Sequence, residues 1–530
     1  ESNAKVEAIN ISLNLGQHET PYVATFTFGG EIPVGPGVLH ISYVGELNDK
    51  MAGFYRSRYK SVTGEEKYMA STQFEALDAR RCLPCWDEPD VKATFECSLT
   101  VADHLTAFSN MPETTVTQLK DNKKLIHFDV TPKMSTYLLA FCVGEFDFVQ
   151  AYTKSRVAVR VYTPPGKQHL GTYALDAGVR SLDFYDDFFG IPYPLPKLDM
   201  VAIPEFAMGA MENWGLVTYR EVDLLIDEQK ASSQQKQRVT TVVTHELAHQ
   251  WFGNLVTMKW WDNLWLNEGF ASWMQNFSAD FLHPDWKMWD QFTINAMSIA
   301  RSKDALRSSH PIQVPIGHAE EVEEVFDAIS YYKGACVVRM AFAVLGEEHF
   351  RAGLQSYFKK YGYGNTVTSQ LWDSWSEVSG KDITGLMGVW TGRMGYPVVT
   401  VTAVDEASGD VTVSQEWFLS DGGELSEEEK GYLWTLPLMV SSGGSTELVM
   451  MTEQTHVLPG VAKDGAAVLL NAGQQSLYRV NYGPVLLPRL AACLPTLSSI
   501  DRASLITDGV ALAKAGTVSL EQVLNLLGAC

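Results

Sequence analysis

Cysteine is scarce in this chain of 530 residues, and its scarcity excludes a disulfide-stabilised fold. The seven cysteines are spread thinly and form an odd number, at positions 82, 85, 97, 142, 336, 493 and 530. Cys82 and Cys85 form a lone CxxC motif with no second pair, so we interpret them as structural thiols and not as part of a zinc ribbon or a redox pair.

Long apolar runs and an excess of basic residues are also lacking. The sequence has no run of about eighteen uncharged apolar residues, so it predicts no membrane-spanning helix. Lys and Arg number 41 against 63 Asp and Glu, which gives a formal charge of −22. This balance excludes a nucleic-acid partner, because phosphate binding requires clustered Lys and Arg.

No leader-like stretch follows Glu1, and the first residues already have a strand pattern. A segment of about 40 residues at the other end has a helical pattern but is too short for a core of its own. We therefore expect a fragment that is truncated at both ends. Its length still exceeds that of a single core, and two to four domains are expected.

The hydrophobic periodicity divides the chain into four parts and predicts a multidomain α+β protein. Residues 1–157 have short alternating runs and predict an incomplete antiparallel β domain, with strands at 6–15, 22–28, 38–44, 94–101, 124–130 and 137–143. Residues 158–394 are mostly helical and predict the catalytic domain. Residues 395–484 predict a small β-sandwich, and residues 485–530 the start of a truncated α-helical domain.

One helical stretch in the middle of the chain contains two histidines and a glutamate in the pattern HExxH. His245 and His249 are four residues apart, so on a helix both side chains lie on one face and can bind the same metal ion. Glu246 lies about 100° around the helix, where it can reach a water held by that ion. This spacing indicates a zinc site with Glu246 as the general base.

A catalytic zinc site needs a third protein ligand, and Glu268 follows His249 after eighteen residues. On one straight helix His245 and Glu268 would stand about 35 Å apart, so the chain must fold back between them. Gly253 and Asn254 mark the expected break, and Asp262 or Asn263 is expected to cap a second helix. Two His and one Glu leave a fourth position for water, which is typical of catalytic zinc.

These motifs resemble those of the gluzincin zinc aminopeptidases, a family related to thermolysin. The similarity is carried by the HExxH motif with Glu268, by Tyr331 in the segment 329–334, and by a GAMEN segment upstream. Further matching stretches lie at residues 72–75, 84–89 and 390–397, so the resemblance covers most of the chain. The puromycin-sensitive branch is the most similar, which implies a cytoplasmic enzyme with a thermolysin-like catalytic domain and one Zn²⁺ per chain.

The resemblance also implies the roles of several other residues. Tyr331 would stabilise the oxyanion that forms when the peptide bond is attacked, and Glu212 would bind the free amino group of a peptide substrate. Gln73 and Glu75 would form part of the wall of the same pocket. The remaining substrate-binding residues implied by the GAMEN segment are Gly209, Ala210, Met211 and Asn213.

Two positions depart from the family pattern and concern substrate preference. Met208 replaces the small residue that is common before the GAMEN segment, and Tyr332 occupies a position that is often Ser. Three alternatives to an aminopeptidase remain open at this point. They are a zinc endopeptidase, an epoxide hydrolase of the same clan, and a non-catalytic zinc-binding scaffold or inactive fragment.

Overall fold

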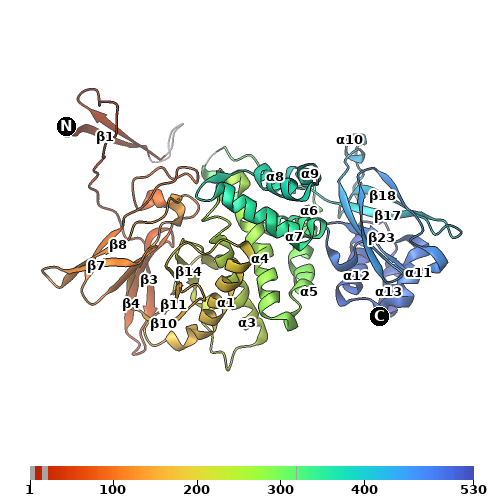
Figure 1. Ribbon diagram of the computed structural model, residues 1–530, viewed down its shortest axis with the longest axis horizontal. Coiled ribbons are helices and arrows are strands. Elements are labelled where there is room, and N and C mark those ends of the chain that lie inside the picture. Colours follow the sequence, from red (N-terminus) through yellow and green to blue (C-terminus); the bar gives the residue numbers. More distant parts are fainter. Residues whose placement is uncertain (1–5, 15–21, 318, 530) are drawn as a thin grey trace.

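The computed structural model describes residues 6–14, 22–317 and 319–529. Figure 1 shows strands of the amino-terminal part at one end, long helices in the middle, and further strands with the last helices at the other end. The predicted α+β class, with an antiparallel amino-terminal β domain followed by a mostly helical domain, is confirmed.

Three antiparallel sheets make up the described part of the amino-terminal domain. The first pairs β1 (Ala8–Asn14) with β2 (Val23–Phe28), and Figure 1 shows this pair away from the rest of the domain. The second has the order β3 (Gly53–Lys60), β4 (Glu66–Gln73), β9 (Phe141–Gly144) and β6 (Thr106–Ser109). The third has the order β5 (Ser98–Ala102), β8 (Lys123–Phe128) and β7 (Glu113–Gln118).

The strand predicted at residues 38–44 is wrong, because these residues are irregular and nearly all exposed. Instead, β3 and β4 form the long hairpin of this domain. Side chains of β3 alternate between buried and exposed positions, as in a strand with one face on a core. The hairpin lies against the central domain, where the Tyr55 hydroxyl donates to the backbone oxygen of Glu205. The last residues of β4 are buried, and β4 therefore carries Gln73 into the central domain.

A five-stranded mixed sheet begins the central domain. Its order is β10 (Asp147–Tyr152), β11 (Ala158–Thr163), β12 (Lys197–Ile203), β14 (Leu216–Arg220) and β13 (Ala210–Met211). The three middle strands are parallel, and the two outer strands run antiparallel to their neighbours. β10 lies before the predicted domain border at residue 157, although it belongs to this sheet.

Helices form the rest of the central domain. They are α1 (Thr172–Phe189), α2 (Glu221–Leu224), α3 (Ser233–His249), α4 (Trp265–Leu282), α5 (Met288–Phe292), α6 (Ser298–Asp304), α7 (Gly334–Tyr361), α8 (Thr368–Ser379) and α9 (Ile383–Gly392). A short π-helix, η8 (Ile329–Lys333), runs directly into α7. A parallel pair of short strands, β15 (Thr257–Met258) and β16 (Asn365–Thr366), lies beside them.

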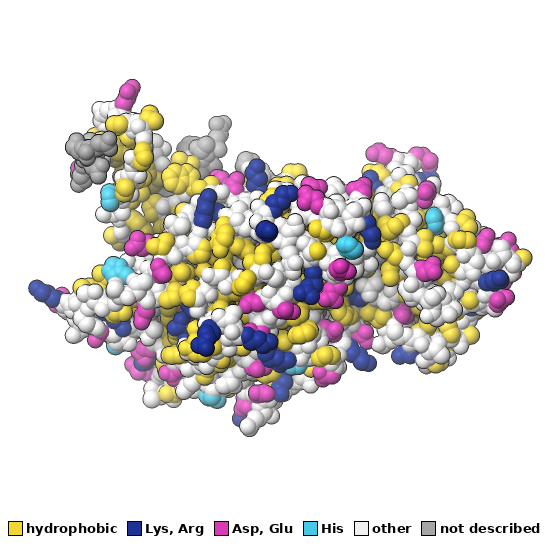
Figure 2. All heavy atoms as spheres, in the orientation of Figure 1, with side chains coloured by type: hydrophobic (Ala, Val, Ile, Leu, Met, Phe, Trp, Pro, Cys, Tyr) yellow, Lys and Arg dark blue, Asp and Glu magenta, His cyan; other side chains and the backbone are white. Residues whose placement is uncertain are grey.

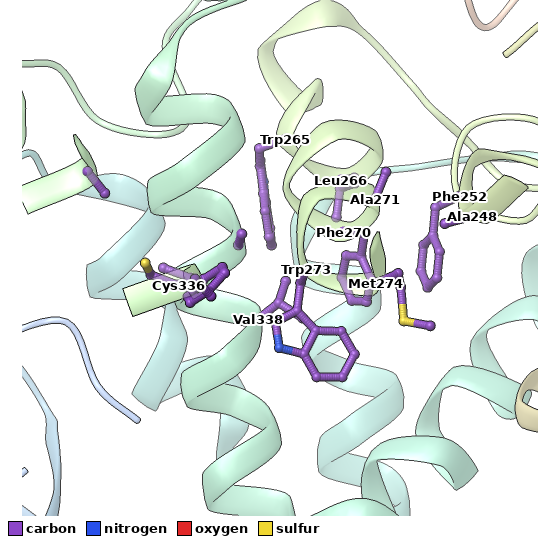
Figure 3. Close-up of a cluster of buried hydrophobic side chains, with 14 of the residues drawn as sticks. Ala248, Phe252, Trp265, Leu266, Phe270, Ala271, Trp273, Met274, Cys336 and Val338 are labelled. Carbon is purple, nitrogen blue, oxygen red and sulfur yellow. The ribbon is translucent and has the colours of Figure 1, made fainter. Parts of the chain in front are cut away.

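The centre of this domain is α4, which is buried on all sides over its first ten residues. An apolar helix of this kind requires neighbours all around it. Figure 3 shows Phe270 of α4 beside Phe252, and Trp273 of α4 beside Val338 of α7. The rings of Phe252 and Phe270 are stacked with centroids 4.1 Å apart. This packing fixes α4, and with it Glu268, against the turn that follows α3.

Two glycines bring the backbones of α4 and α7 into close contact. A Cβ added to Gly269 would lie 3.0 Å from the backbone of Gly334, and a Cβ added to Gly334 would lie 3.0 Å from the Cα of Gly269. Since Glu268 precedes one glycine and η8 precedes the other, this contact sets the separation of Glu268 and the segment that carries Tyr331.

We expect the substitution Gly334→Ala to destabilise the central domain by about 1–3 kcal/mol, because the added methyl group overpacks a backbone contact. Gly388→Ala is the matched control, since Gly388 is also helical but its added Cβ would meet nothing within 4 Å. The control should gain about 0.5–1 kcal/mol from helix propensity. Urea unfolding measures both variants, and equal stability of the two would contradict this role of Gly334.

The last part of the chain begins with two sheets. One has the order β21 (Thr455–Leu458), β18 (Val411–Trp417), β17 (Pro397–Val404) and β23 (Arg479–Asn481), and the other β20 (Ser445–Met451), β19 (Leu436–Ser442) and β22 (Val468–Leu469). A short helix, α10 (Glu427–Lys430), lies between the strands, and α11 (Gly483–Cys493), α12 (Ser499–Lys514) and α13 (Leu520–Gly528) follow.

Acidic side chains are scattered over the face seen in Figure 2, including the tip at α10 with its run of three glutamates. This distribution agrees with the formal charge of −22. Within the described residues, none of the helices combines the length and the apolar character needed to cross a membrane.

Candidate metal centre and peptide site

Helix α3 carries two histidines in its last turns. The helix begins with a capping box, in which the Ser232 side chain accepts from the Gln235 amide and the Gln235 side chain accepts from the Ser232 amide. The Nε2 atoms of His245 and His249 lie 3.1 Å apart and point to the same place. The helical spacing therefore brings both imidazoles to one point, as predicted.

Glu268 completes a triangle of donor atoms. Its Oε2 atom lies 3.3 Å from His245 Nε2 and 3.5 Å from His249 Nε2. Zinc binds nitrogen and oxygen at about 2.0–2.2 Å in a tetrahedron, which places neighbouring donor atoms about 3.3 Å apart. The three distances fit one tetrahedral Zn²⁺ held by these residues, with one further position left for a non-protein ligand.

The other nitrogen of each imidazole is fixed by an acceptor. His245 Nδ1 lies 2.9 Å from Oε1 of Gln275, and His249 Nδ1 lies 3.0 Å from the backbone oxygen of Phe252. An Nδ1–H directed at such an acceptor leaves Nε2 free to bind metal, which is the usual arrangement around zinc histidines. Tautomers are thus assigned from hydrogen-bond partners.

The charge at this centre is negative and calls for a cation. Burial alone lowers the pKa of His249, but Glu212 and Glu268 outweigh burial and raise it well above the usual range. Burial alone raises the pKa of Glu268, whereas His249 and His245 bring it well below the usual range. A positive charge between these groups, either a proton or a metal ion, is therefore stabilised.

The turn after α3 depends on glycine. Gly253 has a φ of 125°, and a Cβ there would lie 3.1 Å from the amide of Asn267 and 3.6 Å from His249 Nδ1. The helix ends earlier than the break expected at Gly253 and Asn254, because α3 stops at His249, and Gly253 lies in the turn that follows. The cap expected from Asp262 or Asn263 is wrong: α4 begins after Leu264 without a side-chain cap. Asn263 Oδ1 accepts instead from the backbone and side chain of Thr368.

Glu246 lies next to the histidines and is buried. Ligand atoms of Glu212, Glu246 and His249 all lie within 4.8 Å of one another. Burial raises the pKa of Glu246 well above its usual value, and the carboxylates of Glu212 and Glu268 add to this effect. A carboxylate with raised proton affinity at this position is suited to accept a proton from a water at the metal centre.

Tyr331 reaches the centre from η8. Its ring is parallel to that of His245, with an interplanar angle of 3° and centroids 6.3 Å apart. Burial raises the pKa of Tyr331 well above its usual value, and Glu268 raises it further, so the hydroxyl remains a hydrogen-bond donor. Tyr331 lines the central cavity, whereas Tyr332 is absent from the described residues that line it.

The GAMEN segment lies along the edge strand β13. Glu212 follows this strand, and its Oε1 lies 3.8 Å from His249 Nδ1. Its backbone oxygen accepts from the side chains of Gln250 and Asn254, at 3.2 and 2.8 Å. These two bonds tie the segment to the end of α3, so the position of Glu212 follows that of the histidines.

The other members of this segment divide into two groups. Ala210 and Met211 line the cavity together with Glu212. Gly209 and Asn213 make backbone and buried contacts beside it: Gly209 O accepts from the amide of Arg220, and the Asn213 side chain donates to Thr218.

A second acidic group lies opposite. Glu75 follows β4 across the domain border, and one carboxylate oxygen from each of Glu75, Glu212 and Glu268 lies within 4.8 Å of the others. Among the described residues, Glu75 Oε1 and Glu212 Oε1 are buried without a hydrogen-bond partner. Burial raises the pKa of both carboxyls, and their mutual repulsion raises that of Glu75 further. Burying such carboxylates reduces the stability of the fold unless a cationic ligand binds between them.

Both histidines, the four carboxylates described above and Tyr331 line one cavity. Gln73 lines it too, and its side chain donates to the backbone oxygen of Glu75 at 3.4 Å. The cavity therefore has a metal-binding wall, a carboxylate wall and a hydroxyl donor.

Comparison with known families agrees with this geometry. The amino-terminal residues 1–138 match the Peptidase M1 N-terminal domain, residues 173–390 match the Peptidase family M1 domain, and residues 467–530 match the ERAP1-like C-terminal domain. The chain belongs to the peptidase M1 family.

Several M1 proteins are similar to almost the whole chain. Puromycin-sensitive aminopeptidase of Caenorhabditis elegans is 47% identical over 501 residues, which is 92% of this chain and 52% of the relative. Aminopeptidase M1-C of rice (Oryza sativa subsp. japonica) is 46% identical, covering 96% and 58%. Alanine/arginine aminopeptidase of Saccharomyces cerevisiae is 43% identical, covering 99% and 61%. The chain thus spans between half and two thirds of the length of these relatives.

Three contributors to the M1 site were not predicted from the sequence. Glu323 and Phe326 line the cavity from the segment before η8. Gln275 binds His245 from α4, and the sequence contains a signal for it, because Gln275 follows Glu268 by seven residues and so lies on the same face of the helix. Met208, noted in the sequence as a departure, also lines the cavity.

We expect Gln275→Ala to weaken zinc binding by about 10–100-fold, the usual effect of removing the partner of a metal-binding histidine. Competition with a fluorescent zinc chelator measures the change. Gln234→Ala, an exposed glutamine at the start of α3, is the control and should bind zinc like the unmodified chain. Unchanged affinity in Gln275→Ala would contradict the role assigned to its contact with His245.

Proposed function

We propose that this member of the M1 family is a zinc aminopeptidase that hydrolyses the first amino acid from peptides with a free amino terminus. The observation that carries the proposal is the pair of buried carboxylates, Glu75 and Glu212, each of which has an oxygen with no hydrogen-bond partner among the described residues, beside the triangle of His245, His249 and Glu268. A metal centre next to a buried, negatively charged wall suits a substrate that ends in an ammonium group. The similar M1 proteins are named aminopeptidases, which supports the same activity.

His245, His249 and Glu268 would hold one Zn²⁺ per chain. When bound there, zinc lowers the pKa of a coordinated water to about 7 and polarises the carbonyl of the scissile bond. Glu246 accepts the proton of the attacking water and passes it to the leaving amine. The Tyr331 hydroxyl donates a hydrogen bond to the carbonyl oxygen as negative charge develops on it.

The opposite wall of the cavity binds the amino terminus of the substrate. Glu212 and Glu75 pair with the α-ammonium group, and Gln73 holds the backbone of Glu75 in place. Gly209, Ala210, Met211 and Asn213 keep the edge strand beside the substrate. We infer that the buried carboxylates of this wall limit the substrate to one residue on that side of the metal, so that only the first peptide bond reaches the zinc centre.

The alternatives fit the site less well. An endopeptidase needs a cavity that continues past the metal centre in both directions, whereas Glu75 and Glu212 place buried charge on one side. A non-catalytic scaffold has no need of Glu246, and an epoxide hydrolase has no need of a second carboxylate for an ammonium group. We further propose a cytoplasmic location, which agrees with the six free cysteines among the described residues.

Digestion of an unmodified ten-residue peptide tests the proposal. The zinc-loaded chain should remove residues one at a time from the amino terminus, seen by mass spectrometry as a ladder of shortened products. Elemental analysis should find about one zinc per chain, lost in His249→Ala. A single internal cut would favour the endopeptidase, and no cleavage by a zinc-loaded chain would favour the scaffold.

A further inference from the structure

The start of η8, the segment that carries Tyr331, is held by a single residue outside it. Asp327 Oδ1 accepts from the amides of Ile329 and Ser330, at 2.9 and 3.1 Å. The backbone oxygen of Asp327 accepts from the amide of Tyr331 at 3.1 Å. Asp327 therefore accepts hydrogen bonds from the first three amides of the π-helix. The residue that directly precedes the helix, Ala328, provides no side-chain cap.

The second oxygen of Asp327 binds a histidine from the loop that follows α6. His310 Nε2 lies 2.8 Å from Asp327 Oδ2, and His310 Nδ1 lies 2.7 Å from the backbone oxygen of Pro311. Both ring nitrogens thus face acceptors. A neutral imidazole has only one N–H, so satisfying both acceptors requires the doubly protonated imidazolium. His310 and Asp327 form an ion pair, not merely a hydrogen bond.

The charges around this pair favour the same state. The hydrogen bond that His310 donates to Asp327 raises the pKa of His310, and the carboxylate of Asp304 on α6 adds to the effect from further away. Burial alone raises the pKa of Asp327, but the bonds from His310 and from the Ser330 amide outweigh it and lower the pKa. Asp304 is itself paired with the buried Lys333 of η8 at 2.8 Å.

Side chains thus hold η8 at both ends. At its far end, Lys333 also donates to the backbone oxygens of Arg393 and Gly395, and this end is fully buried. The near end is different, because the side chains of His310 and Asp327 are 30% and 35% exposed. Only the near anchor is in contact with solvent, so it is the one that can respond to the surrounding pH.

We propose that His310 and Asp327 are positioning residues for the reaction, whose ion pair fixes the start of η8 and thereby the hydroxyl of Tyr331. The inference rests on the proposed function, because Tyr331 matters only if a peptide carbonyl is attacked in this cavity. An oxyanion donor acts over a narrow range of distance and direction, so a small shift of η8 weakens it. The pair is complete while His310 is protonated and is lost as pH rises through its raised pKa.

A double-mutant cycle tests the positioning role. Asp327→Asn keeps an oxygen for the amides of η8 but removes the charge, and Tyr331→Phe removes the hydroxyl but keeps the ring. We expect Asp327→Asn to lower kcat about 10-fold and to change KM by less than about 2-fold. This loss of kcat is smaller than the 10²–10³-fold loss expected when an oxyanion donor is removed entirely, because the Tyr331 hydroxyl is only displaced. In the Tyr331→Phe background the same change should lower kcat by less than about 2-fold.

The matched control is Asp382→Asn, because Asp382 caps α9 through Gly385 in the same manner but lies on another helix. It should leave kcat unchanged in both backgrounds. A loss of kcat from Asp327→Asn that is equal with and without the Tyr331 hydroxyl would overturn the proposal, since it would show an effect on the fold alone.

The ionisation state of the His310–Asp327 pair can be measured by NMR without any substrate turnover. The protein is labelled with ¹³C at histidine Cε1, and the NMR signal that is missing in His310→Gln is assigned to His310. The pKa measured from this signal should lie above the ordinary value of about 6.5, and it should move towards that value in Asp327→Asn. In the unmodified chain, kcat should fall at alkaline pH as His310 loses its proton, and this fall should be absent from His310→Gln. A His310 signal that titrates at or below the ordinary value would overturn the proposal. Inactivity of the zinc-loaded chain towards peptides would instead refute the proposed function, while the titration still decides the state of the pair.

Discussion

The substitution Glu246→Gln is expected to lower kcat by about 10²–10⁴-fold while the chain still binds zinc. Gln has the size of Glu and leaves His245, His249 and Glu268 in place, but its amide cannot accept a proton from water. Steady-state hydrolysis of an aminoacyl amide, together with elemental analysis of zinc, measures the two effects separately.

Glu348→Gln is the control for this substitution, because Glu348 lies on the exposed face of α7 away from the cavity. It should retain full activity. Activity of Glu246→Gln close to that of the unmodified chain would contradict the general-base role. Loss of zinc in the same variant would show that Glu246 supports the metal site instead.

The second large effect is expected from Glu212→Gln, which removes the charge nearest to His249 on the peptide-binding wall. We expect kcat/KM for peptides with a free amino terminus to fall by about 10²-fold or more, since losing one partner of a buried charge pair costs about 2–5 kcal/mol. Amino-blocked peptides bring no ammonium group, so their slow hydrolysis should change little. Comparing the two substrates in the variant and in the unmodified chain measures the difference.

Glu75→Gln extends this prediction. Glu75 and Glu212 share one site, so the double substitution should cost less than the product of the two single effects. Equal losses of Glu212→Gln on free and blocked peptides would contradict recognition of the ammonium group and would point to a general effect on the metal centre.

The meeting of His245, His249 and Glu268 could be predicted from the sequence because its geometry is local. The helical spacing of His245 and His249 fixes their common face, and the turn through Gly253 allows Glu268 to return to them. The capping box of α3 is local in the same way, because Ser232 and Gln235 are three residues apart. These are interactions within or between adjacent helices.

Predictions failed where a distant partner decides the outcome. Asn263 has the sequence of a helix cap, but Thr368, 105 residues later, takes its side chain. Residues 38–44 alternate like a strand, but a strand also needs a neighbour with which to pair. The periodicity of a segment does not reveal which partner the fold brings to it.

The residues of the peptide-binding wall, Glu212 and Gln73, were predicted by a third route. Glu212 and Gln73 were expected from a family resemblance and not from spacing, because their meeting depends on how β4 and β13 approach α3. His310 and Asp327 are 17 residues apart and lie in no regular element that would have related them. Their role became visible only from the hydrogen bonds of η8.

The most direct test of the account compares hydrolysis of one aminoacyl amide with and without an N-acetyl group, using the unmodified zinc-loaded chain. A site built around an ammonium group should prefer the free substrate in kcat/KM by about 10⁴-fold, because the blocked one leaves Glu75 and Glu212 buried without a partner. Equal values of kcat/KM for the two substrates would contradict the assignment as an aminopeptidase.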